Sequence, residues 1–212
     1  MQGQVFELFP TPVVVFNLGR DFTAEELAWI ATYNDKLSQS RLNWSTKADR
    51  VLNDPPAANL KKFIHDRMND YFKHVYQPDC DASLYITQSW INHTKGGEAH
   101  HQHYHGNAFV SGCMYVDVEE GDRIHFYSRE FADRWFEIPT SNYNKYNSQS
   151  WWVPVKRGDM LFWPSHVPHE VQNLDPERKT TRVTLAYNGF VKGQLGHGDN
   201  SPTLILPEPI DG

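Results

Sequence analysis

Six short segments rich in β-branched and aromatic residues fill the stretch from residue 83 to residue 191. Glycine-containing turns such as Lys95-Gly96-Gly97 and Arg157-Gly158-Asp159 separate several of them. Many short strands with turn residues between them are typical of a β-sandwich, barrel or jelly roll. The sequence therefore predicts a β core, with strands over residues 83–92, 108–118, 123–127, 150–155, 159–164 and 181–191.

The first 80 residues predict a broken strand followed by two helices. Residues 5–18 are β-branched and aromatic, but two prolines interrupt them, which suits an edge strand. Thr23 and Glu26 have the spacing of a capping box, which predicts a helix from there to about Ser38.

A second helix is indicated by Asp54 as N-cap and Pro55 as first helical residue. Beyond them, large side chains recur at the three-and-four spacing of one helix face. We expect this face to cover the sheet through Leu60, Phe63, Ile64, Arg67, Met68, Tyr71, Phe72 and Val75.

These patterns predict an α+β protein with a jelly-roll core and N-terminal helices packed against its sheet. A length of 212 residues suits one domain. We expect that domain to span residues 1–192, with a helical part over 1–80 and the β core over 83–191. We expect residues 193–212 to form an extended or loosely ordered tail. The polar segment 139–149 is expected to form a surface loop or a lid.

Composition argues against several classes of partner. The formal net charge of −6 disfavours nucleic acid, and the N-terminus shows neither a signal peptide nor an apolar run long enough for a membrane span. Cys80 and Cys113 form no CxxC pair, which disfavours a disulfide scaffold or a thiolate zinc site. We expect a soluble cytoplasmic protein, and an oligomer is compatible with the sequence.

Four of the 11 histidines fall within six consecutive positions, in the stretch Glu98-Ala-His-His-Gln-His-Tyr-His105. Alternate side chains of a strand point the same way, so His101, His103 and His105 are expected on one face and His100 on the other. Neutral imidazole is a common ligand of transition metals, and we therefore predict that at least two of the four bind a metal. A solvated polar loop is the alternative.

A third ligand and an anion site are indicated further along the chain. Residues 157–169 predict a turn, a buried strand and a proline-stopped loop, with a new strand starting near His169 that can return beside His105. Arg182 and Thr184 occupy alternate positions of an otherwise apolar strand. A buried cation is costly without an anion, so an inward Arg182 suggests a ligand with a carboxylate. An outward Arg182 in an internal salt bridge is the alternative.

Three stretches of the chain carry three different short motifs, one after another. They run from His103 to Val116, from Gly158 to His169 and from Arg182 to Asn188. They match the patterns H-x-H-x-N…S-G-x-x-Y-V, G-D-x-x-F-x-P-S-x-x-x-H and R-x-(S/T)-x-x-x-N. In this order they resemble the 2-oxoglutarate- and Fe(II)-dependent oxygenases, and more narrowly an oxygenase family of bacteria and phages. The resemblance covers about residues 5–190.

The resemblance implies a double-stranded β-helix, a cupin-like jelly roll, with iron(II) at one open end. His103 takes the place of the first ligand, His105 that of the usual carboxylate, and His169 that of the distal histidine. An all-histidine set departs from the superfamily pattern, in which the second ligand is an Asp or Glu. His101, or a carboxylate such as Glu98, is held in reserve for that second place.

The resemblance also implies 2-oxoglutarate as cosubstrate. Arg182 and Thr184 match the pair that holds its far carboxylate, and Asn92 and Tyr115 are weaker candidates for the same cosubstrate. The implied activity is hydroxylation of an unknown small molecule or peptide with dioxygen, and it needs no catalytic residue beyond the metal ligands. Two alternatives keep the jelly roll without 2-oxoglutarate: a three-histidine dioxygenase, which would not need a buried Arg182, and a non-catalytic binding module.

Overall fold

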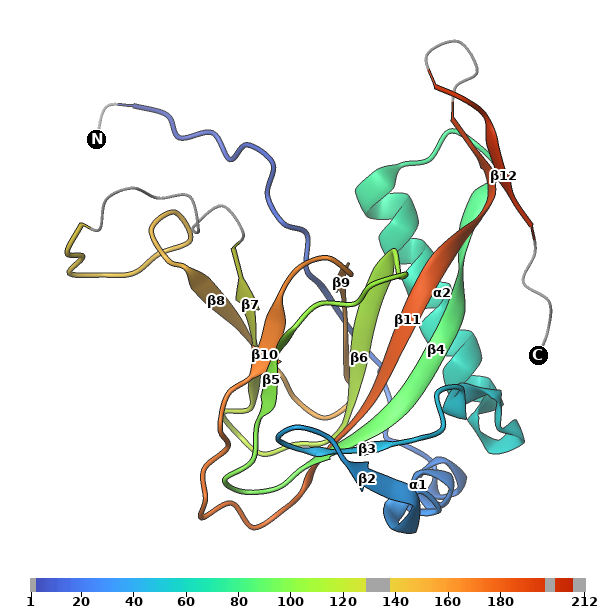
Figure 1. Cartoon of the computed structure of the whole chain (residues 1–212), viewed down its shortest axis with the longest axis vertical. Coiled ribbons are helices and arrows are strands. Elements are labelled where there is room, and N and C mark those ends of the chain that lie inside the picture. Colours follow the sequence, from blue (N-terminus) through green and yellow to red (C-terminus); the bar gives the residue numbers. More distant parts are fainter. Residues whose placement is uncertain (1–2, 129–137, 197–200, 208–212) are drawn as a thin grey trace.

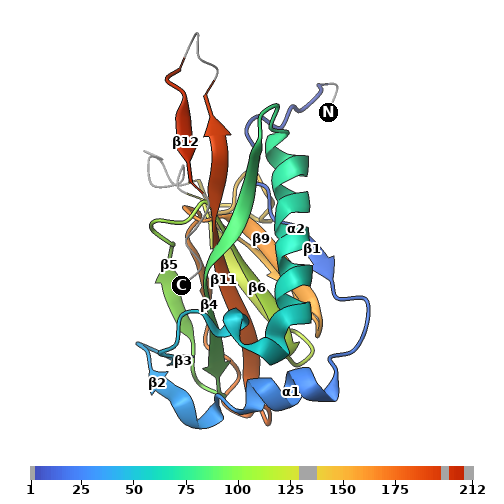
Figure 2. The same ribbon diagram turned by 90° about the vertical axis from the view of Figure 1, so that its right-hand side faces the viewer.

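Two antiparallel β-sheets face each other in the computed structural model, which describes residues 3–128, 138–196 and 201–207 (Figure 1). The larger sheet carries a long helix on its outer face (Figure 2). This arrangement is the predicted α+β jelly roll. Among the residues that the structure describes, no helix is long and apolar enough to cross a membrane.

The larger sheet holds eight strands and forms one wall of the jelly roll. Its order is β1 (Val14–Asn17), β9 (Asp159–Pro164), β6 (Val110–Asp117), β11 (Arg182–Leu195), β4 (Ala82–Thr94), β3 (Trp44–Thr46) and β2 (Leu37–Gln39), with β12 (Leu204–Leu206) beside β11.

The smaller sheet forms the opposite wall, seen on the left of Figure 1. Its order is β5 (His100–His103), β10 (His169–Val171), β7 (Arg123–Tyr127) and β8 (Ser150–Pro154). All six strands predicted between residues 83 and 191 form, with ends within a few residues of the predicted ones. Segment 139–149 contains no helix or strand, and its Tyr146 hydroxyl donates a hydrogen bond to Glu7 at 3.0 Å.

Both ends of the chain differ from expectation. Of the predicted strand over residues 5–18, only Val14–Asn17 forms, at the edge of the larger sheet. At the other end, β11 continues to Leu195 and β12 pairs back onto it, so that the described part of the predicted tail contains a β-hairpin. Figure 2 shows this hairpin rising above the sheet.

The first helix, α1 (Ala24–Ala31), starts as predicted and ends early. The Thr23 hydroxyl accepts a hydrogen bond from the N–H of Glu26, whose carboxylate accepts one from the N–H of Thr23, which is a complete capping box. The predicted end at Ser38 is wrong, because Leu37–Gln39 pairs with β3 as an edge strand. Pairing in the sheet outweighs local helix propensity here.

The second helix, α2 (Ala58–Tyr76), follows a 3₁₀ turn over Pro55–Ala57. Asp54 was predicted as the N-cap, but its side chain makes no capping hydrogen bond. Its carboxylate instead accepts hydrogen bonds from the Trp29 indole at 2.8 Å and the Tyr33 hydroxyl at 2.5 Å. Asp54 therefore fastens the start of α2 to the segment around α1.

The apolar face of α2 packs against the larger sheet, as predicted. Leu60, Ile64, Met68 and Tyr71 on that face are fully buried. The close approach depends on Gly189 of β11, because a Cβ atom there would lie 2.4 Å from the sulfur of Met68. This packing leaves the inner face of the larger sheet free to line the space between the sheets.

A buried ion pair fastens the turn between β6 and β7. Arg178 donates to both carboxylate oxygens of Asp122, at 2.7 and 3.1 Å, and the two side chains are 4% and 5% exposed. Glu119 lies 3.9 Å from Arg178 Nε and is itself half-exposed. The pair ties this turn to the segment that leads into β11.

Replacing Asp122 by alanine should lower the free energy of unfolding by about 3–5 kcal/mol, because it leaves the buried guanidinium of Arg178 without its main counterion. Urea denaturation measures the loss. Asp66→Ala is the matched control, since it breaks an exposed pair with Lys62 on α2 and should cost less than about 1 kcal/mol. Equal losses in the two variants would contradict the role given to the Asp122 pair.

Candidate metal centre and anion pocket

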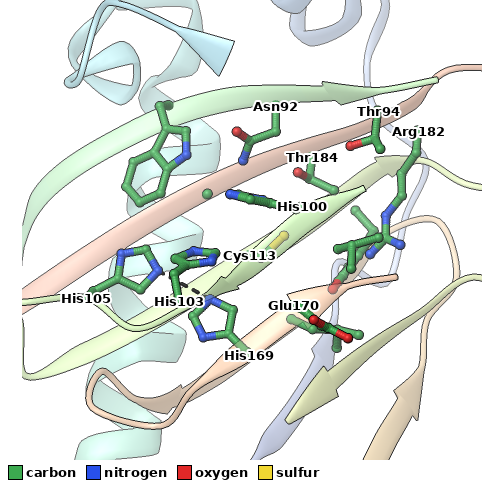
Figure 3. Close-up of a pocket in the computed structure, with 15 residues that line it drawn as sticks. Asn92, Thr94, His100, His103, His105, Cys113, His169, Glu170, Arg182 and Thr184 are labelled. Carbon is green, nitrogen blue, oxygen red and sulfur yellow. Dashed lines mark hydrogen bonds between the residues drawn. The ribbon is translucent and has the colours of Figure 1, made fainter. Parts of the chain in front are cut away.

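A pocket between the two sheets collects side chains from six strands and from His105 (Figure 3). The strand register explains why they meet. Thr184 of β11 lies opposite Asn92 of β4 on one side and opposite Tyr115 of β6 on the other, and directly paired residues share a face of the sheet. The pocket is lined by Trp90, Asn92, Thr94, His100, His103, His105, Cys113, Tyr115, Ile124, His169, Glu170, Val171, Arg182, Thr184 and Ala186.

Three histidines converge at one end of this pocket. The ligand nitrogens of His103, His105 and His169 all lie within 4.8 Å of one another. His103 ends β5 and pairs directly with His169, which begins β10, while His105 follows two residues after β5. The Nε2 atoms of His105 and His169 are 3.3 Å apart (Figure 3).

Backbone carbonyls fix the orientation of two of these rings. The Nδ1 atom of His103 is 2.7 Å from the carbonyl oxygen of His101, and that of His169 is 3.0 Å from the carbonyl oxygen of Val167. A carbonyl oxygen only accepts hydrogen bonds, so each Nδ1 must carry the proton and each Nε2 has a free lone pair. Such an outer hydrogen bond is the usual support of a metal-binding histidine.

Burial keeps the triad in its neutral form. It lowers the pKa of His105 to about 4, with a further contribution from the neighbouring His103, and it also lowers the pKa of His103 and His169. Neutral imidazole is the form that binds metals. In one tautomer His105 Nε2–H can donate to the Nε2 lone pair of His169 at 3.3 Å, and in the other tautomer both Nε2 lone pairs are available to one cation. The donor set therefore fits a transition-metal ion.

Arg182 lies at the other end of the pocket and is almost fully buried, with 2% of its surface exposed. Its Nη1 donates to the carbonyl oxygen of Arg123 at 3.0 Å, and the guanidinium carbon is 5.1 Å from the centre of the Tyr115 ring. Among the described residues, no carboxylate lies within 4 Å of the guanidinium, and the buried Tyr115 hydroxyl has no hydrogen-bond partner. A buried cation and an unpaired hydroxyl together fit an anionic ligand.

The structure brings all seven first-choice residues of the sequence analysis to this one pocket, but neither reserve ligand. His101 does not line it. The two carboxylate oxygens of Glu98 accept hydrogen bonds from the Trp44 indole at 3.0 Å and from the N–H of Lys95 at 2.8 Å, so Glu98 stabilises a turn instead.

The expected alternation of the histidines is wrong, and His100 rather than His101 faces the pocket. His103 pairs with His169 and His100 pairs with Val171, so three steps along β5 match two along β10. This bulge places one extra residue in β5 and reverses the faces of the residues before it. The His100 ring stacks on that of His103 with centroids 4.4 Å apart.

Three further pocket residues with ionisable side chains were not assigned to the site from the sequence. Cys113 lies two positions before Tyr115 on β6, and strand alternation would have found it. Burial raises the pKa of its thiol to about 11. Glu170 follows His169, and its carboxylate accepts a 2.5 Å hydrogen bond from the Tyr127 hydroxyl. His100 belongs to the histidine cluster but was expected on the opposite face, because nothing in the sequence marks the bulge.

The four tryptophans of strands β4, β8 and β9 divide into three groups. Trp90 lines the pocket, and its ring centroid is 5.6 Å from that of His105. Trp163 is buried core, with its ring centroid 4.8 Å from that of His169. Trp151 and Trp152 on β8 are about half exposed, at 49% and 46%.

Solved structures share this fold. The epimerase SnoN from nogalamycin biosynthesis, in complex with Fe3+, alpha ketoglutarate and nogalamycin RO, superposes with a TM-score of 0.61 at 13% identity, over 95% of this chain and 92% of that chain. A Pseudomonas putida prolyl-4-hydroxylase gives a TM-score of 0.52 at 11% identity, over 84% and 92% of the two chains. A Burkholderia pseudomallei oxidoreductase of the 2OG-Fe(II) oxygenase family gives 0.53 at 14%, over 84% and 83%. The double-stranded β-helix fold is thereby confirmed. None of the curated proteins matches the sequence.

A jelly roll that encloses three converging histidines, together with a buried arginine that has no carboxylate partner among the described residues, suits an oxygenase that uses iron and a keto acid, with a histidine at the place of the usual carboxylate ligand. Residues 88–188 match the family model described as "Putative 2OG-Fe(II) oxygenase", and this stretch contains every residue that lines the pocket. Over this stretch, which makes up most of the β core, the chain is similar to the 2OG-Fe(II) oxygenases. The protein is accordingly a 2-oxoglutarate- and Fe(II)-dependent oxygenase.

Proposed function

We propose that this oxygenase is a hydroxylase that holds iron(II) with His103, His105 and His169 and 2-oxoglutarate with Arg182 and Thr184. The observation that carries the proposal is the pairing, in one pocket, of three converging neutral imidazoles with a buried guanidinium that has no counterion within the part of the chain that the structure describes. SnoN, which has the same fold, was crystallised with both an iron ion and the keto acid.

The charge of the site supports 2-oxoglutarate in particular. Three neutral imidazoles bring no negative charge to iron(II), Arg182 adds a third positive charge, and Glu170 is the one carboxylate among the residues that line the pocket. A dicarboxylate supplies two negative charges, one at each end. A three-histidine dioxygenase without 2-oxoglutarate would leave Arg182 buried without an anion, which is costly.

The chain would hold the cosubstrate at its far end. The guanidinium of Arg182 can donate two parallel hydrogen bonds to a carboxylate, and the Thr184 hydroxyl can donate a third. The Tyr115 hydroxyl has no hydrogen-bond partner among the residues that the structure describes, and Asn92 lies opposite Thr184 in the register. We assign these two side chains supporting roles toward the same cosubstrate.

The chemistry of the reaction would come from the bound iron and 2-oxoglutarate and not from protein side chains. When bound, iron and 2-oxoglutarate supply the oxidation, in which dioxygen is consumed and the cosubstrate loses carbon dioxide to become succinate. The protein orients both groups and keeps water out. Val167 and His101 contribute through their carbonyl oxygens, which hold His169 and His103 with their lone pairs toward the metal.

The substrate enters beside an aromatic rim. Trp90 lies against His105, and Tyr104, which precedes His105 in the chain, is 58% exposed. We propose a small molecule or a peptide as substrate, with dioxygen as the second reactant. The cytoplasm is the proposed compartment, since Cys80 and Cys113 are free thiols, as is usual in a reducing environment.

Succinate release tests this function. The protein is loaded with iron(II) without oxygen, supplied with 2-oxoglutarate and then exposed to air. We expect succinate that depends on iron, on 2-oxoglutarate and on oxygen, slow without a substrate and faster with the right one. Folded, iron-loaded protein that forms no succinate with any member of a substrate panel would contradict the proposal.

A further inference from the structure

A second buried polar cluster lies beside the metal site and takes no part in the reaction described so far. Ser111, Ser165 and Asn188 are 1%, 1% and 3% exposed. Hydrogen bonds join the two serine Oγ atoms at 2.9 Å and Ser111 Oγ to Asn188 Oδ1 at 2.8 Å. Asn188 Nδ2 donates to Gln88 Oε1 at 3.1 Å. The cluster thus joins β6, β11 and β4 to the residue that follows β9.

The chemistry of these groups fixes the direction of the hydrogen bonds. An amide oxygen only accepts, so the single hydroxyl proton of Ser111 must go to Asn188. The bond between the serines therefore has Ser165 as its donor. The result is a chain of donors from Ser165 through Ser111 and Asn188 to the exposed Gln88, in which each buried hydroxyl has its partner.

The backbone of Ser165 holds the loop that carries His105. The N–H of His105 donates to the carbonyl oxygen of Ser165 at 3.0 Å, and the N–H of Ser165 donates to the carbonyl oxygen of Phe109 at 3.2 Å. Ser165 thus fastens both ends of the loop over residues 105–109. Because this loop lies beyond β5, the pairing of the smaller sheet does not place His105.

Ser165 also stands at the base of the segment that carries His169. Pro164 accepts a hydrogen bond from the N–H of Val167 at 2.9 Å, which closes a turn around Ser165. The carbonyl oxygen of Val167 in turn holds the His169 ring. One buried serine therefore stands between the backbone segments of two of the three converging histidines.

We propose that Ser165 is a positioning residue for the metal site, and that its side chain, held by Ser111 and Asn188, fixes the backbone that places His105 and His169. The inference rests on the proposed binding of metal by these histidines. Outer groups that orient metal ligands typically contribute ten- to a hundredfold to metal affinity. Loss of the Ser165 hydroxyl leaves both backbone hydrogen bonds in place but removes the side-chain link between this backbone and Ser111 of β6.

Metal binding by full-length Ser165→Ala tests the inference. We expect the Kd for Ni²⁺, measured by calorimetry, to rise about tenfold or more, and the visible spectrum of bound Co²⁺ to change because the ligand geometry has changed. Ser111→Ala breaks the same chain at its middle and should act in the same direction. If Ser165→Ala does not fold, Ser111→Ala decides.

Ser89→Ala is the matched control. Ser89 is 1% exposed on β4, and its Oγ accepts the N–H of Leu52 at 2.9 Å, away from the pocket. The Ser89→Ala substitution should lower the melting temperature without changing the Ni²⁺ Kd or the Co²⁺ spectrum. Serine variants that match the wild type in both readouts would overturn this inference alone. If the His169→Ala variant bound Ni²⁺ as tightly as the wild type, the proposed function would be overturned as well.

Discussion

Arg182→Leu is expected to weaken 2-oxoglutarate binding at least about a hundredfold and to leave iron binding unchanged. Two hydrogen bonds from a guanidinium to a carboxylate contribute about 3 kcal/mol or more, and every 1.4 kcal/mol is a factor of ten in affinity. The Arg182 side chain is not part of the histidine cluster, so the metal ligands keep their arrangement. Anaerobic titration of the iron-loaded protein with 2-oxoglutarate measures the change.

The same variant should make the ligand-free protein more stable. Arg182 is a buried cation without a carboxylate partner among the described residues, and replacing buried charges by apolar side chains is often stabilising by about 1–4 kcal/mol. A gain in stability together with a loss of affinity separates a ligand-binding arginine from a structural one. Urea denaturation without ligand measures the gain.

Arg123→Leu is the control for the loss of positive charge. Arg123 is exposed, and its guanidinium lies over the Trp152 ring with its central carbon 5.3 Å from the ring centre. Its backbone carbonyl, which accepts from Arg182, is unchanged by the substitution. We expect an ordinary 2-oxoglutarate affinity. Should Arg182→Leu also bind 2-oxoglutarate with wild-type affinity, the assignment of Arg182 would be wrong.

His169→Ala is expected to abolish iron binding, with an affinity at least about a hundredfold below that of the wild type. His169 is 5% exposed and is the most buried member of the triad, and its ring centroid lies 4.4 Å from that of His103 and 5.2 Å from that of His105. Two neutral imidazoles without a third ligand hold a divalent ion poorly. Iron content after anaerobic loading and desalting measures the loss.

His74→Ala is the control for the loss of one histidine. His74 is exposed on α2, away from the pocket, and the variant should keep one iron per chain. Circular dichroism should show that both variants are folded. One tightly bound iron per chain in His169→Ala would mean that the metal lies elsewhere.

The strands and the pocket follow from local patterns and motif order. Alternation along apolar strands put Arg182 and Thr184 on the inner face, and the order of the motifs indicated that His103, His105 and His169 would meet. Strand alternation and motif order can both be read from the sequence of each segment alone, because side chains alternate between the two faces of any strand.

The rest depended on contacts between distant segments. The bulge in β5 arises from its pairing with β10, and it turned His100 rather than His101 inward. Asp54 accepts hydrogen bonds from Trp29 and Tyr33 instead of capping the helix that follows it, because packing brings those two donors close to its carboxylate. A hydrogen-bond donor 21 or 25 positions away leaves no signal in the local sequence.

A crystal structure of the protein with iron(II) and 2-oxoglutarate, grown without oxygen, tests the central claim most directly. It should show the metal bound by His103, His105 and His169, and the far carboxylate of 2-oxoglutarate paired with Arg182. A metal bound by a carboxylate such as Glu170, or 2-oxoglutarate bound away from Arg182, would contradict the account.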